Sequence, residues 1–107
     1  MNHEQKPRDI RERTFNFAIR IGKLCQILDE KPGVGRTLGQ QLLCSGTFIG
    51  ANLEEAQAGQ SKADFIHKNA IILKEARETL YWLRLVAATN IISAEKLIEV
   101  FNLKQKN

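Results

Sequence analysis

The chain has 107 residues, of which 43% are hydrophobic and 26% are charged, and it contains two prolines. These values are typical of one globular domain, and they exclude a disordered chain and a multidomain enzyme. No apolar run approaches the roughly 20 residues of a membrane span, and the charged residues 1–13 lack the apolar core of a signal peptide. We therefore expect a cytoplasmic protein without a membrane partner. Two cysteines are too few for a disulfide scaffold.

The charge is unevenly distributed along the chain. Sixteen basic and twelve acidic residues give a net charge of +4. Residues 1–36 hold eight of the basic residues and five of the acidic ones. A basic surface favours an anionic partner such as RNA or DNA, but a modest excess of charge also serves solubility. Both interpretations stay open on charge alone.

Breaks in the sequence divide the chain into four predicted helices within one domain, 1–107. The strongest break is Pro32-Gly33-Val34-Gly35, because proline ends a helix and glycine permits the left-handed turn that follows. After a flexible N-terminus, 1–8, we expect helices at about 9–30, 37–58, 62–89 and 94–104. Short oxygen-bearing side chains that can cap helix N-termini stand at Asp9, Thr37, Ser61 and Ser93.

The first predicted helix has an unusually wide apolar surface. Its polar stripe is narrow, whereas a surface helix needs only one apolar face. The extra apolar face predicts a second burial partner, most simply another subunit. The third predicted helix is also broader in its apolar surface than one neighbour requires. The candidate residues for an oligomer interface are Phe15, Phe17, Ile21, Leu24, Tyr81 and Trp82.

The second predicted helix contains small residues at helical spacing. Gly46 and Gly50 share one face, and a close approach of another helix can offset the stability that glycine costs inside a helix, roughly 1 kcal/mol. Asn52 falls on the same packed side, where a buried amide could fix the register between helices.

The third predicted helix carries a heptad pattern. Ile66, Leu73, Leu80 and Ala87 recur every seven residues, which is typical of a core seam in an antiparallel helical bundle. Lys74 and Glu78 have the spacing of an intrahelical ion pair. Together these patterns predict an all-α fold, an antiparallel up-down four-helix bundle with a short fourth helix.

No catalytic constellation is evident. Asp64 and His67 have the carboxylate–histidine spacing of di-iron bundles, but those sites need a second such element, which is missing. Gly33-Val34-Gly35 lacks the lysine and hydroxyl residue of a phosphate-binding loop. We therefore predict no catalytic residues, no metal, no cofactor and no enzymatic activity.

The remaining candidate site is a basic stripe. Arg13, Arg20 and Lys23 recur at helical spacing in the first helix, and Lys6, Arg8 and Arg11 lie just before or beside them. Repeated around an oligomer, such a stripe would form a belt that binds nucleic-acid phosphates. The alternative is a solvated polar face.

Three segments of the sequence resemble a known family. They are QLLCSGTFIGANLEEA at 41–56, SKADFIHK at 61–68 and KEARETLYWL at 74–83. In this order they resemble the four-helix bundle family first noted as products of intervening sequences in bacterial 23S ribosomal RNA genes. The resemblance extends from about Phe15 to Leu103.

The resemblance implies an up-down bundle that assembles into a homopentameric ring without enzymatic activity. The chain is also similar to the accessory proteins of diversity-generating retroelements, whose basic barrels bind a reverse transcriptase and nucleic acid. We therefore expect a homo-oligomer that binds RNA or DNA through its basic surface and serves as an accessory to a nucleic-acid enzyme. The alternative is an adaptor ring that binds only protein. Two departures bear on this expectation: Cys44 stands where the family usually has arginine, and the fourth helix is short.

Overall fold

The computed structural model describes residues 9–56, 58 and 61–101, and within these ranges the chain forms four helices and no strand. The helices are α1 (Ile10–Leu28), α2 (Val34–Ala56), α3 (Lys62–Ala88) and α4 (Ala94–Phe101). The all-α prediction and the short fourth helix are therefore confirmed. The predicted flexible N-terminus, 1–8, and the predicted last turn at 102–104 lie outside the described residues.

Three of the four predicted N-caps are present. The side chain of Asp9 accepts a hydrogen bond from the Arg11 amide at 3.0 Å, Ser61 from the Asp64 amide at 3.2 Å, and Ser93 from the Lys96 amide at 3.0 Å. Each of these caps satisfies a backbone N–H that the first turn of a helix leaves without a partner.

The predicted cap at Thr37 is wrong. Helix α2 begins at Val34, directly after Gly33, whose φ of 120° completes the turn in a conformation that favours glycine. The Thr37 amide donates to the Gly33 carbonyl at 3.2 Å, which places Thr37 inside the first helical turn. Because the Pro32-Gly33 turn is so short, the helix starts three residues earlier than the capping pattern predicts.

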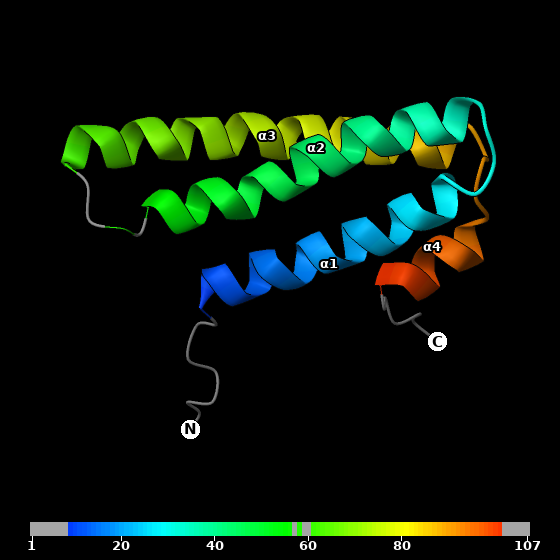
Figure 1. Cartoon of the computed structure of the whole chain (residues 1–107), viewed down its shortest axis with the longest axis horizontal. Coiled ribbons are helices and arrows are strands. Elements are labelled where there is room, and N and C mark those ends of the chain that lie inside the picture. Colours follow the sequence, from blue (N-terminus) through cyan, green and yellow to red (C-terminus); the bar gives the residue numbers. More distant parts are fainter. Residues whose placement is uncertain (1–8, 57, 59–60, 102–107) are drawn as a thin grey trace, which may run out of the picture.

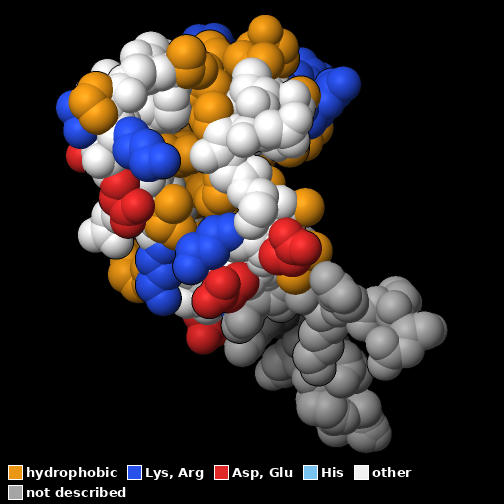
Figure 2. Space-filling model, turned by 90° about the vertical axis from the view of Figure 1, so that its right-hand side faces the viewer, with side chains coloured by type: hydrophobic (Ala, Val, Ile, Leu, Met, Phe, Trp, Pro, Cys, Tyr) orange, Lys and Arg blue, Asp and Glu red, His pale blue; other side chains and the backbone are white. Residues whose placement is uncertain are grey.

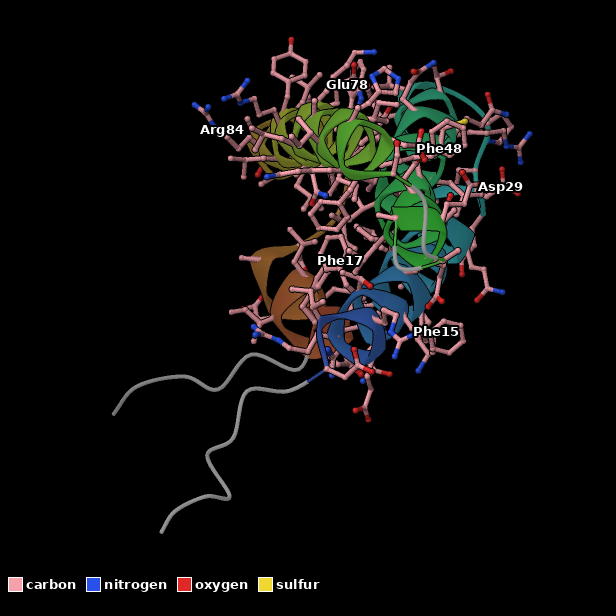
Figure 3. The ribbon with its side chains drawn as sticks, turned by 90° about the vertical axis from the view of Figure 1, so that its left-hand side faces the viewer. Phe15, Phe17, Asp29, Phe48, Glu78 and Arg84 are labelled. Carbon is pink, nitrogen blue, oxygen red and sulfur yellow. The ribbon has the colours of Figure 1, made fainter. Side chains whose placement is uncertain are left out.

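The helices follow one another around an open arc. Helix α2 packs against both α1 and α3, and α4 packs against α1. Figure 1 shows the chain turning back at each connection, so that α2 lies between its two neighbours in sequence. Seen along the helices, α3 and α4 stand at the two ends of the arc, and Phe17 of α1 points into its inner side (Figure 3).

The core lies where α1, α2 and the C-terminal part of α3 meet. Ile21, Leu24, Leu42 and Val86 are fully buried there. At Gly46 a Cβ atom would lie 3.0 Å from Cγ2 and 3.2 Å from Cγ1 of Ile21, so α1 and α2 approach each other closely at this point. At Gly50 the nearest atom would be 3.7 Å away, an ordinary contact. Close packing therefore requires glycine at Gly46 but not at Gly50.

The heptad residues of α3 do not form a core seam. Ile66, Leu73 and Leu80 are 59%, 52% and 58% exposed, and Ala87 is exposed as well. Helix α3 turns another face inward, with Thr79 and Val86 buried. The prediction fails because α3 stands at the end of the arc, where packing against α2 covers one face and leaves the heptad face outside.

A buried hydroxyl pair, rather than Asn52, links α2 to α3. The Asn52 amide donates to the Phe48 carbonyl of its own helix at 2.9 Å, so it does not fix the register as predicted. Thr79 Oγ1 instead donates to Ser45 Oγ at 3.0 Å, and both residues are only 3% exposed. Since buried polar groups are costly without partners, this pair favours one alignment of the two helices.

Candidate nucleic-acid interface

Helices α1 and α4 enclose a shallow groove of about 550 Å³ along one side of the arc. Helix α1 contributes two residues of the predicted basic stripe, Arg20 and Lys23, and α4 contributes Lys96. The other lining residues are Asn16, Ile19, Gln26, Ile27, Glu99 and Val100. We call this the α1–α4 groove. It combines cations and amides, which bind phosphate and polar ligands, with an apolar base.

The position of α4 depends on a few local features. Asn90 adopts a φ of 58°, a left-handed conformation that asparagine tolerates, and reverses the chain after α3. Ser93 then caps α4. The rings of Phe17 and Phe101 pack with centroids 6.2 Å apart, and this contact helps to hold α4 against α1. The groove therefore exists because the short fourth helix folds back along α1.

The stripe carries positive charge that neighbouring acids do not cancel. Among the described residues, no ion pair includes Arg13, Arg20 or Lys23. Lys96 Nζ lies 3.5 Å from Glu99 Oε1, so its charge is partly balanced. Figure 2 shows basic and acidic side chains intermixed at one end of the molecule, and that end is not a uniform basic patch. The uncancelled charge is not confined to α1, because no ion pair of the described residues includes Lys31, Lys62, Arg77 or Arg84 either.

The structure separates two residues of the predicted stripe, Arg11 and Arg13, from the α1–α4 groove. Arg11 lies on the α2 side of α1, where its guanidinium contacts Asp9 at 3.1 Å. These hydrogen bonds lower the pKa of the Asp9 carboxyl and keep the charge of Arg11 balanced. Arg11 therefore does not belong with Arg20 and Lys23, because the nine helical residues from Arg11 to Arg20 place it about 180° around α1 from Arg20. Lys6 and Arg8 lie outside the described residues, and Arg13 is exposed but does not line the groove.

Lys96 is the groove residue that the sequence interpretation missed. It lies between two acids in a helix of eight residues, where the sequence suggests a neutral, solvated surface. Only the packing of α4 on α1 brings it beside Arg20 and Lys23.

Other polar groups have ordinary structural roles. Lys68 pairs with Glu55, and Lys74 Nζ lies 3.9 Å from Glu78 Oε2, as the spacing predicts. Within the described ranges there is no cluster of His, Cys, Asp and Glu that could hold a metal ion. None of the described helices is long and apolar enough to cross a membrane.

A family model for the 23S rRNA-intervening sequence protein matches residues 6–106. The chain belongs to this family. A crystal structure of a protein of unknown function from the S23 ribosomal protein family of Bacteroides thetaiotaomicron is 42% identical, with a TM-score of 0.75. The match covers 88% of this chain and 86% of that protein. A comparison with curated proteins gives no match.

In this family member, the six residues predicted at an oligomer interface divide into three groups. Ile21 and Leu24 are fully buried inside the chain, so their assignment to an interface is wrong; the wide apolar surface of α1 partly serves the chain's own core. Phe17 and Trp82 are half-buried against that core. Phe15 and Tyr81 are 65% and 56% exposed and stay available to a partner.

The two cysteines of this family member differ in environment. Cys25 is buried, its thiol donates to the Gly39 carbonyl at 3.2 Å, and burial raises the pKa of the thiol to about 11. Cys44 is exposed on α2. An arginine at this position, which the family resemblance leads us to expect, would reach solvent and add one exposed positive charge to α2.

Proposed function

We propose that this member of the 23S rRNA-intervening sequence protein family is a non-enzymatic protein that binds RNA or DNA phosphates in the α1–α4 groove. The observation that carries the proposal is the convergence of Arg20, Lys23 and Lys96 on one groove, two of them without an acidic partner among the described residues. Exposed cations without compensating acids attract the phosphate backbone, which supplies most of the affinity in sequence-independent binding.

The lining of the groove favours backbone contacts over base recognition. Asn16 and Gln26 offer amide donors for phosphate or sugar oxygens, and Arg20 can hold a phosphate with two parallel hydrogen bonds. Glu99 repels phosphates at the α4 side, so the chain of a nucleic acid would follow α1 toward Arg13. Arg13 extends the same face of α1 beyond the groove.

Assembly of several chains would present several copies of this weak phosphate site to one nucleic acid. On the family resemblance we propose that antiparallel up-down bundles form a homopentameric ring, in which one groove per subunit contributes to a shared basic surface. Several weak phosphate sites held together bind a polymer far more tightly than one site. Such a ring would serve as an accessory to a nucleic-acid enzyme such as a reverse transcriptase.

The test is a fluorescence anisotropy titration of labelled single-stranded RNA and double-stranded DNA at two salt concentrations. The test variant replaces Arg20, Lys23 and Lys96 with glutamate. A control variant replaces three exposed lysines outside the groove, Lys31, Lys62 and Lys74, with glutamate, and it carries the same net charge. We expect the test variant to lose affinity and salt dependence, about 0.7–0.9 of log–log slope per lost phosphate contact, while the control keeps most of both. Equal losses would refute the groove as the site.

The second proposed function is an adaptor that binds only protein. Its support is the number of large apolar side chains at the surface, which include Phe48 at 51% and Phe65 at 45% exposure. Exposed apolar side chains in such number mark protein interaction surfaces. An association with a partner protein that survives nuclease treatment, together with no nucleic-acid binding at low salt, would favour this function over the first.

A further inference from the structure

The α1–α4 groove has an apolar lining that phosphate binding does not explain. Three aliphatic side chains form this lining, Ile19 and Ile27 from α1 and Val100 from α4. Ile27 and Val100 are half-buried against the core of the chain, whereas Ile19 is 43% exposed. An aliphatic surface does not attract a phosphate, because removing a charge from water is costly. The apolar lining therefore indicates a ligand that has an apolar face as well as a negative charge.

The cations of the groove lie beside its apolar lining on both helices. On α1, Lys23 follows Ile19 by four residues and precedes Ile27 by four. On α4, Lys96 precedes Val100 by four. Residues four apart are neighbours on one face of a helix. A ligand in the groove therefore meets positive charge and apolar surface together, from either wall.

A nucleotide with an unpaired base carries both of these chemical features. Its phosphate suits the cations, and the flat face of its base packs on apolar side chains whatever its sequence. In a duplex both faces of each base stack on neighbouring bases, so the outer surface offers phosphates but no free base face. A flexible single strand can follow a groove of about 550 Å³. A duplex, which is stiff over about 50 nm, cannot turn one strand into it.

We infer that the α1–α4 groove selects single-stranded nucleic acid over duplex. Arg20, Lys23 and Lys96 hold the phosphates, and the apolar lining takes the face of an unpaired base. The inference rests on the proposed function and deepens it, since it names the class of nucleic acid. Charge alone predicts the opposite preference, because a duplex carries one charge per about 1.7 Å of its axis and each of its strands only one per about 3.4 Å. Strand preference therefore distinguishes this groove from a purely electrostatic site.

The test compares three DNA ligands of equal length by fluorescence anisotropy at low salt. They are oligothymidine, its duplex with oligoadenosine, and a strand of the same sugar and phosphate units without bases. We expect oligothymidine to bind about threefold to tenfold more tightly than either of the others, a smaller gain than an aromatic surface provides. A duplex or a base-free strand that binds as tightly would overturn the inference. Displacement of oligothymidine by polyglutamate at equal charge would do the same, because it shows a site for any polyanion.

Ile19→Ala tests the apolar lining without changing the charge of the groove. We expect it to weaken binding of oligothymidine about threefold and to leave duplex binding and salt dependence unchanged. Leu43→Ala is the matched control, because Leu43 lies on α2 outside the groove and is 42% exposed. The readout is the ratio of the two affinities within each variant, so that a change in assembly, which alters both, is not mistaken for a change in the groove. Circular dichroism checks folding, and Val100→Ala replaces an unfolded Ile19→Ala; an unchanged ratio in the folded variant would overturn the inference.

The outcomes also separate this inference from the proposed function. Duplex preference that disappears when Arg20, Lys23 and Lys96 are replaced with glutamate would overturn the inference alone. Absence of binding to every ligand at low salt would overturn the proposed function and the inference with it.

Discussion

The glycines of α1 and α2 allow a sharp test of helix packing. Replacing glycine with alanine inside a helix stabilises it by about 1 kcal/mol when the new methyl group has room. Gly22 has that room, because nothing lies within 4 Å of its Cβ position. At Gly46 the methyl group would lie 3.0 Å from Cγ2 of Ile21, which is fully buried and cannot move aside freely. Overpacking of a core costs about 1–3 kcal/mol.

These magnitudes predict opposite outcomes for two chemically identical changes. Gly22→Ala should raise the free energy of unfolding by about 1 kcal/mol. Gly46→Ala should lower it by about 0–2 kcal/mol, because the packing cost exceeds or cancels the gain in helix propensity. Gly50→Ala, whose nearest contact would be 3.7 Å from Thr14, should behave like Gly22→Ala.

The assay is urea unfolding followed by far-ultraviolet circular dichroism. Each variant is measured at two protein concentrations, so that any contribution of assembly is visible as a concentration dependence. The difference between Gly46→Ala and Gly22→Ala, about 1–3 kcal/mol, isolates the packing term because helix propensity cancels. Equal stability of the two variants would refute the close approach of α1 and α2 at Ile21.

Three further predictions concern single contacts. Thr79→Val should lower the free energy of unfolding by about 1 kcal/mol, since Ser45 Oγ loses its buried donor, and urea unfolding measures this loss. Phe17→Ala should speed hydrogen exchange in α4 without affecting the middle of α3, because the Phe17–Phe101 contact holds α4 on α1; unchanged exchange in α4 would contradict it. The raised pKa of Cys25, about 11 against 9.0, favours the neutral thiol in the folded chain, so stability should be complete below pH 9 and fall between pH 9 and pH 11. Cys25→Ala should lack this fall, which unfolding at several pH values checks.

Local features of the sequence predicted the fold well, and features that depend on neighbours did not follow from it. Asp9, Ser61 and Ser93 cap helices as expected, because a cap depends on only a few adjacent residues. The heptad of α3 identifies residues that share a face, but periodicity does not say whether a neighbour covers that face. The pattern therefore predicts Leu80 in the core, although its side chain is exposed at the surface.

The candidate site shows the same division. The spacing of Arg20 and Lys23 places them on one face of a helix, and the structure brings both to one groove. Lys96 completes that groove from a helix more than seventy residues away in sequence. No sequence pattern around Lys96 predicts that it lies beside Arg20 and Lys23. Arg11 is close to the stripe in sequence, but the turn of the helix places it on the α2 side of α1.

The open arc has a consequence for how binding could depend on the amount of protein. The α1–α4 groove lies at one end of the arc and the exposed heptad face of α3 lies at the other. On the proposed function, a nucleic acid and a neighbouring copy would therefore not compete for the same face of the chain. On the proposed assembly, chain concentration determines how many grooves a single polymer meets at once. The fraction of nucleic acid bound would then rise steeply above a threshold protein concentration rather than in proportion to it. The expression level of the protein would thereby set whether the nucleic acid is bound.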